Sequence, residues 1–130
     1  MYYVYIVKCS DDSLYTGVAA DICRRMQQHI SRSGEGAKYT RSHPVKELVA
    51  LWKSHDKSSA FKLEYAIKKL KREEKLKLIY SPDDIHESIP SLCGEDYLKV
   101  VGVTLEECLV YAEKKMSEDE KEKFIRKLNA

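Results

Sequence analysis

Two short runs of β-branched and aromatic residues, separated by a polar turn, open the chain. Residues 2–7 are all apolar or aromatic, which predicts a strand buried on both faces. Residues 9–13 have turn chemistry and residues 14–18 resume the strand pattern, so we predict a β-hairpin. Because side chains alternate along a strand, a loop with an odd number of residues places Tyr5 and Tyr15 on the same face, and we predict an odd loop.

The next stretch changes to a helical period, with Asp21 as the predicted N-cap of a helix that ends at about residue 30. Apolar residues recur at every fourth position and mark the side that we expect to be buried: Ile22, Met26 and Ile30. Arg25 and His29 are also four positions apart and border this side. We therefore expect both to face the edge of the sheet rather than open water.

Residues 31–44 are polar and contain glycine, which predicts a loop. Residues 47–53 form a third β-type run. A long helix is predicted next, capped by Ser58 or Ser59, running to about residue 72 and continuing brokenly to about residue 79. Helical spacing predicts the inward face of this helix: Ala60, Leu63, Ile67 and Leu70.

A carboxylate interrupts the inward face of this predicted helix. Glu64 lies four positions after Ala60 and three before Ile67, so we expect its side chain to be shielded from water. Burying a carboxylate is costly unless it is paired or binds a cation. Spacing alone leaves two interpretations, a salt bridge to Lys68 one helical turn later or a functional site.

Residues 81–130 contain further helical patterns. Pro82 stands at the first position of a predicted short helix, Thr104 and Glu107 form a predicted capping box, and Ser117 precedes a last predicted helix. We therefore predict an α/β (α+β) chain in two parts, a domain over residues 1–80 and an acidic helical extension over residues 81–130.

The composition fits a chain that folds around a modest core. Of the 130 residues, 43% are hydrophobic, so we expect one main domain and no global disorder. No apolar run approaches the ~20 residues that span a membrane, and the apolar start is too short for a signal peptide. The four cysteines form no C-x-x-C pair, which favours free thiols in a cytoplasmic protein over a zinc or redox site.

The net charge of +2 hides an uneven distribution of charge. Residues 1–80 carry 16 lysines and arginines against 9 acidic residues, whereas residues 81–130 carry 7 against 12. A basic first part suits a polyanionic ligand, although an ordinary solvated surface has the same signature. The residues that we expect to contact nucleic-acid phosphates or bases are Arg24, Lys38, Tyr39, Arg41, Lys68, Lys69, Lys71 and Arg72.

The polar residues of the first part follow one another in a known pattern. The order is Tyr3-Val4-Tyr5, then Tyr15-Thr16-Gly17, then residues 21–29 with Arg25 and His29, then a helix bearing Glu64. Together these segments resemble the GIY-YIG endonuclease domain over residues 2–80, and they are most like its small standalone bacterial members. Tyr3 and Thr16 replace the glycine and isoleucine that name the family, but neither position supplies the phenols of the site, which are those of Tyr5 and Tyr15.

The resemblance implies a three-stranded antiparallel sheet flanked by helices and metal-dependent hydrolysis of DNA phosphodiester bonds, in repair or recombination. It implies that Glu64 holds one divalent cation, Mg²⁺ or Mn²⁺, and that Arg25 grips the scissile phosphate. Tyr15 would orient water or phosphate, and either Tyr5 or His29 would be the general base.

Two alternatives to an endonuclease stay open. The domain could bind nucleic acid, DNA or RNA, without cleaving it, and residues 81–130 could dock a partner protein as an adaptor. Neither the oligomeric state nor the preferred DNA structure follows from the sequence.

Overall fold

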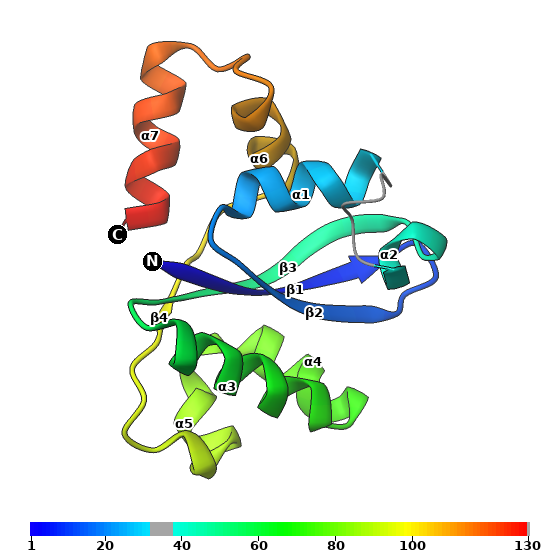
Figure 1. Ribbon diagram of the computed structural model, residues 1–130, viewed down its shortest axis with the longest axis vertical. Helices are drawn as coiled ribbons and strands as arrows, with labels where there is room; N and C mark the ends of the chain where they lie inside the picture. The colour runs from blue at the N-terminus through cyan, green and yellow to red at the C-terminus, as the bar shows by residue number, and fades with distance from the viewer. Residues whose placement is uncertain (32–37, 130) are drawn as a thin grey trace.

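The computed structural model describes residues 1–31 and 38–129 (Figure 1). The strands are β1 (Tyr2–Cys9), β2 (Leu14–Ala19), β3 (Val45–Ser54) and β4 (Leu98–Lys99). The helices are α1 (Ile22–Ser31), α2 (Lys38–Ser42), α3 (Lys57–Lys69), α4 (Arg72–Tyr80), α5 (Ile85–Ser88), α6 (Leu105–Ala112) and α7 (Glu118–Asn129), and short 3-10 helices form η1 (Pro82–Asp84) and η2 (Pro90–Leu92).

The sheet separates two layers of helices. Its strand order is β2-β1-β3-β4, and neighbouring strands are antiparallel. Helices α1, α6 and α7 lie on one face, and α3, α4 and α5 lie on the other (Figure 1). Alternate residues of the central strand β1 enter opposite cores, because Tyr5 and Val7 pack with α1 whereas Val4 and Ile6 pack with α3. The prediction of a strand buried on both faces is confirmed.

The β1–β2 hairpin has the parity that the sequence predicts. Lys8 pairs with Leu14, so the five residues 9–13 form the loop between the last paired positions. The odd number is confirmed, and it places the two tyrosines on one face because Val7, two residues after Tyr5, pairs with Tyr15.

The prediction of three strands was wrong, because the sheet has a fourth. Strand β4 pairs with β3 through only two residue pairs, Trp52 with Lys99 and Lys53 with Leu98. Leu98 and Lys99 are both exposed, so the strand has no buried face and leaves no hydrophobic alternation in the sequence. The strand is held where the chain passes beside β3, and there the Val100 amide donates a hydrogen bond to the Leu51 carbonyl at 2.8 Å.

Helix α1 begins as predicted but buries a different last residue. The Asp21 carboxylate accepts a hydrogen bond from the Arg24 amide at 3.1 Å, which confirms the N-cap. The expected buried stripe was wrong at Ile30, which is 39% exposed, whereas His29 is fully buried. Counted from Ile22, position i+7 returns to within about 20° of the same helix face, but position i+8 departs by about 80°.

The predicted loop over residues 31–44 was wrong in part, since α2 occupies Lys38–Ser42. Thr40 is the residue of α2 that is buried. A helix of five residues is too short to show a hydrophobic period, so the sequence pattern does not reveal it. Residues 32–37, which the same prediction covers, lie outside the described residues.

Helix α3 has its N-cap at Asp56, so the predicted cap at Ser58 or Ser59 was wrong. The Asp56 carboxylate accepts from the Ser58 amide at 3.1 Å and from the Ser59 hydroxyl at 3.1 Å. Asp56 is the cap because its backbone is extended and its side chain reaches two donors in the first turn of the helix. The helix ends at Lys69 rather than about residue 72, and α4 supplies the broken continuation that the sequence predicts.

The helices of residues 81–130 are confirmed at their predicted starts. Pro82 begins η1, Thr104 and Glu107 form the capping box of α6, and the Ser117 hydroxyl accepts from the Glu120 amide at the start of α7. These residues complete both cores of the sheet. Residues from the second part pack beside α1 in one core (Val100, Val103, Leu105, Cys108 and Phe124) and beside α3 in the other (Ile85, Ile89 and Leu92).

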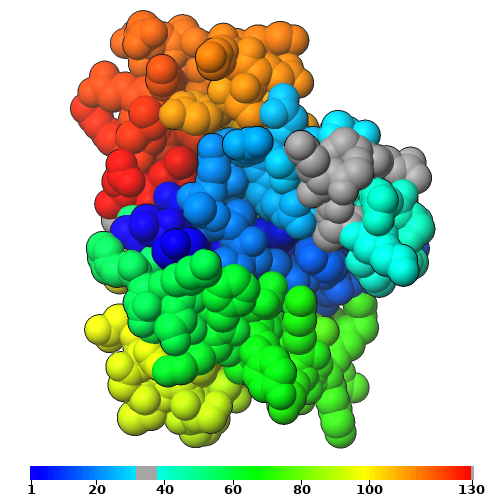
Figure 2. Space-filling model, in the orientation of Figure 1, coloured from blue at the N-terminus to red at the C-terminus, as the bar shows by residue number. Residues whose placement is uncertain are grey.

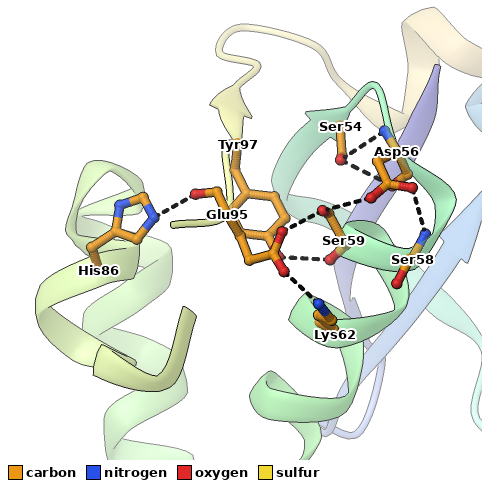
Figure 3. A network of polar contacts seen from close by, with 8 residues as sticks. All are labelled: Ser54, Asp56, Ser58, Ser59, Lys62, His86, Glu95 and Tyr97. Atoms are coloured by element: carbon orange, nitrogen blue, oxygen red, sulfur yellow. Dashed lines mark hydrogen bonds and ion pairs between the residues drawn. The ribbon is translucent and has the colours of Figure 1, made fainter. Parts of the chain in front are cut away.

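Polar contacts fix residues 86–97 to the start of α3 (Figure 3). The Glu95 carboxylate accepts from the Ser59 hydroxyl and the Lys62 ammonium, both at 2.6 Å. The Tyr97 hydroxyl donates to the Ser59 carbonyl at 2.6 Å, and Nε2 of His86 lies 2.7 Å from the Glu95 carbonyl.

The division of the chain into two parts at residue 80 stays a prediction. Within residues 1–31 and 38–129, no helix is long and apolar enough to cross a membrane.

Candidate active site

The five residues predicted to carry chemistry come from four elements that meet on one side of the molecule. Tyr5 lies on β1, Tyr15 on β2, Arg25 and His29 on α1, and Glu64 on α3. Figure 2 shows the hairpin of β1 and β2 between α1 and α3 on the same face. Side chains from segments far apart in sequence are therefore brought together by the fold.

The contacts are closest around the phenol of Tyr5. Its Oη lies 2.7 Å from Nε2 of His29, and it accepts a hydrogen bond from Nε of Arg25 at 3.4 Å. The Tyr15 ring centroid lies 6.4 Å from that of Tyr5 and 5.7 Å from that of His29. The imidazole of His29 and the guanidinium of Arg25 therefore both form hydrogen bonds with the phenol oxygen of Tyr5.

Burial sets the protonation of this group. Burial raises the pKa of Tyr5 above its usual range, and the hydrogen bond and charge of Arg25 oppose this rise without overcoming it. Burial and the Arg25 charge lower the pKa of His29 to about 4. At neutral pH a neutral phenol therefore faces a neutral imidazole, and Arg25 is the cation beside them.

Glu64 belongs to the same neighbourhood. Its negative charge is one of the smaller causes that raise the pKa of Tyr5, after burial. Its side chain is 19% exposed, and one oxygen lies 3.5 Å from the ammonium of Lys68. Lys68 in turn lies 5.7 Å from the centroid of the Tyr15 ring. The salt bridge that spacing alone allows is present, but it is long and partly exposed, so it contributes little to stability.

The donor set at Glu64 suits a hard divalent cation that keeps most of its water. The described residues contain no cluster of three or more His, Cys, Asp and Glu side chains placed to hold a metal. A single carboxylate that reaches solvent fits Mg²⁺, which proteins commonly bind through one or two carboxylates together with substrate phosphates. Glu64 is the residue at this site that would hold it.

The second nitrogen of His29 has a partner that the sequence did not indicate. Nδ1 of His29 lies 2.6 Å from Oγ1 of Thr40, and both side chains are fully buried. Thr40 stands between Tyr39 and Arg41 in a segment whose pattern predicts only a loop. Nothing in that pattern distinguishes Thr40 from the other polar residues of the segment.

Aromatic rings continue from Tyr15 toward the surface, and a separate exposed ring lies on α3. Tyr15 stacks on Tyr39 with centroids 5.7 Å apart, and Tyr39 stacks on His43 at 4.0 Å. On α3, the Lys69 ammonium lies 4.3 Å from the centroid of Tyr65, which is 62% exposed. Tyr65 was not among the predicted contacts, although an aromatic residue among lysines is a pattern typical of single-strand binding.

The other predicted nucleic-acid contacts are dispersed. Lys38 and Arg41 lie on α2 near Tyr39, and Lys71 and Arg72 begin α4 beyond the end of α3. Arg24 lies apart from the Tyr5 phenol, since it lines a cavity of about 630 Å³ with Tyr111 and Lys114 on the α6 side of α1. The fold therefore brings together the five residues predicted to be catalytic but not all the residues predicted to bind nucleic acid.

A family model described as the GIY-YIG catalytic domain matches residues 1–77. The chain belongs to the GIY-YIG family. This match covers β1 to α3 and most of α4, including every element that carries the five residues. A domain family of this kind suggests nuclease activity for the chain.

Individual relatives match the same part of this GIY-YIG chain. A UPF0213 protein of Staphylococcus saprophyticus is 50% identical over 78 residues, which are 60% of this chain and 93% of that protein. A UPF0213 protein of Fusobacterium nucleatum is 38% identical over 91 residues, which are 70% of this chain and 89% of that protein. The solution NMR structure of the UPF0213 protein from Bacillus halodurans is 41% identical, covers 72% of this chain and 98% of its own, and has a TM-score of 0.43.

Proposed function

We propose that this protein is a metal-dependent endonuclease that hydrolyses phosphodiester bonds of DNA. The observation that supports this most directly is the hydrogen-bonded group of Tyr5, His29 and Arg25, with Glu64 in its electrostatic neighbourhood. A base, a phosphate-binding cation and a cation-binding carboxylate are the parts that phosphodiester hydrolysis requires. Membership of the GIY-YIG family supports the same conclusion.

The proton relay is proposed to run through Tyr5 to His29. The raised pKa of Tyr5 makes a stable phenolate unfavourable before substrate binds, so the phenol acts as a relay rather than as a resting base. The attacking water gives its proton to Oη of Tyr5 while the phenol proton passes to Nε2 of His29, 2.7 Å away. Burial and the Arg25 charge lower the pKa of His29 in the free protein, and a phosphate bound to Arg25 offsets that charge and favours the transfer. The hydroxide formed attacks phosphorus, the bond to the 3′ oxygen breaks with its electron pair left on that oxygen, and the leaving 3′ oxygen takes a proton from water.

Arg25 and Glu64 prepare the phosphate for this attack. Arg25 is permanently charged and lies beside the Tyr5 oxygen, so it holds the scissile phosphate next to the activated water. When bound at Glu64, Mg²⁺ or Mn²⁺ would neutralise charge on the phosphoryl oxygens. Tyr15 packs against the rings of Tyr5 and His29 and orients the water or phosphate beside them.

DNA is proposed to cross the surface that α2 and α3 form around this group. Tyr65 offers an exposed ring with the Lys69 ammonium beside it, and Tyr39 is partly exposed. The Lys68 ammonium adds a cation beside Tyr15. Such contacts hold phosphates and bases with little sequence preference and weaken as salt rises. A role in repair or recombination is compatible with this mode of binding.

Nicking of supercoiled plasmid with and without Mg²⁺ tests the proposal. We expect cleavage by the wild type with Mg²⁺ or Mn²⁺, none in EDTA, and none by Glu64→Gln, which should still bind DNA. Glu73→Gln is the matched control because it removes an exposed carboxylate from the next helix, α4. Failure of the wild type to cut single strands, duplexes, flaps and four-way junctions would contradict the proposal.

A second candidate function is binding of nucleic acid without cleavage. The observation that favours it is the ion pair between Glu64 and Lys68, which can occupy the carboxylate in place of a cation. In that case Glu64→Gln and the wild type would bind DNA equally and neither would cut it. Metal-dependent nicking by the wild type alone distinguishes the two functions.

A further inference from the structure

The imidazole of His29 is held at both ring nitrogens by hydroxyl groups. Oη of Tyr5 lies 2.7 Å from Nε2, and Oγ1 of Thr40 lies 2.6 Å from Nδ1. All three residues are fully buried. A neutral imidazole carries one proton, so one nitrogen donates and the other accepts. The chemistry proposed for Tyr5 requires the accepting nitrogen to be Nε2.

The contacts of Tyr5 favour that arrangement. Its oxygen already accepts a hydrogen bond from Nε of Arg25 at 3.4 Å. If Nε2 of His29 also donated, the phenol oxygen would accept two hydrogen bonds. The phenol proton would then have to find an acceptor other than His29. If the phenol donates to Nε2, both hydrogen bonds at the Tyr5 oxygen are satisfied, and the proton of His29 lies on Nδ1.

We propose that Thr40 is a positioning residue, whose hydroxyl oxygen accepts the Nδ1 proton of His29 and so keeps Nε2 free to take the proton of Tyr5. This inference rests on the proposed endonuclease function for its role in catalysis. The tautomer itself is a property of the folded protein and can be measured without substrate. Partners that fix the tautomer of a reactive histidine in this way also fix the orientation of its ring.

The construction of α2 supports a dedicated role for this hydroxyl. Thr40 is the buried residue of a five-residue helix, and the residues on either side of it, Tyr39 and Arg41, are exposed. A buried hydroxyl is costly unless it is hydrogen-bonded, so burial of Thr40 requires such a contact. The single side chain that α2 contributes to the interior is therefore one that reaches the histidine.

The direct test is a long-range ¹H–¹⁵N correlation spectrum of the histidine side chains at neutral pH, with His29 assigned by the signals that vanish in His29→Gln. We expect the Nδ1–H tautomer of His29 in the wild type and in Thr40→Ser, which keeps the hydroxyl. Thr40→Val has the same shape without the hydroxyl, and we expect it to shift His29 toward the Nε2–H tautomer. An Nε2–H tautomer in the wild type would overturn the proposal.

Nicking rates give the second readout. A general base typically accelerates a reaction by ~10²–10⁴-fold. Because Thr40 acts through the base, we expect Thr40→Val to lower kcat by about 10- to 100-fold with KM little changed. Thr40→Ser should keep most of the wild-type kcat. Ser42→Ala, which removes an exposed hydroxyl from the same helix, should leave kcat unchanged. Equal kcat values for Thr40→Val and the wild type would also overturn the proposal. If no variant cuts DNA, the proposed function fails, while the spectrum still decides the tautomer.

Discussion

The phenol ring of Tyr5 lies directly across Gly17 on the neighbouring strand. The two residues are cross-strand partners in the β1–β2 ladder. A methyl group added to Gly17 would lie 2.6 Å from Cζ of the Tyr5 ring and closer still to its oxygen. Gly17 is therefore required by the close approach of a rigid ring. Its absent side chain lets the phenol reach His29.

Gly17→Ala tests this relationship. The added methyl must displace the Tyr5 ring, because the atoms it meets cannot move independently of the ring. We expect a loss of about 1–3 kcal/mol in unfolding free energy, as for overpacked cores, measured by urea denaturation. We also expect nicking to be lost because Oη of Tyr5 moves away from Nε2 of His29.

A double-mutant cycle separates the ring contact from a general effect of alanine. In a Tyr5→Leu background the ring is gone, so Gly17→Ala should be neutral or slightly stabilising, since alanine is preferred to glycine within a strand. If Gly17→Ala costs the same free energy in both backgrounds, contact with the phenol is not the reason for glycine at this position.

Stability should depend on pH through His29. The unfolded chain binds this proton near pH 6.5 and the folded protein only near pH 4, chiefly because of burial. Between these values the unfolded state binds more protons, so stability falls as pH falls, by at most about 1.4 kcal/mol per pH unit. Above pH 6.5 both states are neutral at this residue, and below pH 4 the loss is complete.

His29→Gln provides the comparison for this pH dependence. Urea denaturation of the wild type and the variant from pH 4 to 7.5 should give free-energy differences that shrink as the pH falls. Other groups titrate in both proteins and cancel in the difference. A difference that stays constant over this range would mean that His29 takes up its proton equally well in the folded state.

Metal affinity should depend on bound DNA. Glu64 is one carboxylate, and its described surroundings contain no cluster of three or more metal-ligating side chains. Mg²⁺ at such a site would keep most of its water and would gain affinity from substrate phosphates. Calorimetric titration with Mn²⁺ should detect weak binding to the protein alone and tighter binding with a phosphorothioate DNA that resists cleavage. Tight binding without DNA, retained in Glu64→Gln, would place the metal elsewhere.

The contact between Glu95 and the start of α3 should hold residues 86–97 in place. The Lys62 hydrogen bond is the largest cause that lowers the pKa of Glu95. Glu95→Gln removes this charge, so we expect faster amide hydrogen exchange in residues 86–97 with little change in global stability. Glu122→Gln, which breaks an exposed pair with Arg126, is the control and should leave that exchange unchanged. Equal exchange in both variants would show that the charge of Glu95 is not needed to hold this segment.

Local chemistry explains the predictions that the structure confirms. The apolar run of β1, the Asp21 cap and the Thr104–Glu107 capping box each depend on residues within a few positions of one another. Hairpin parity also follows from the number of loop residues. Two errors depend on how distant segments pack: β4 lacks a hydrophobic period, and Ile30 satisfies a local period but extends past the buried face of α1. The α3 cap was a local error, because Asp56 stands two residues before the predicted Ser58.

The sequence by itself determined which chemical groups this protein has and the order of the elements that carry them. Side-chain periodicity and caps act over one or two turns, so they can be identified without the fold. Only the tertiary structure decided that His29 lies between Tyr5 and Thr40, and that Gly17 gives the phenol its place. Those contacts join segments whose spacing in sequence carries no information about distance, and burial between packed elements sets the protonation of His29 and Tyr5.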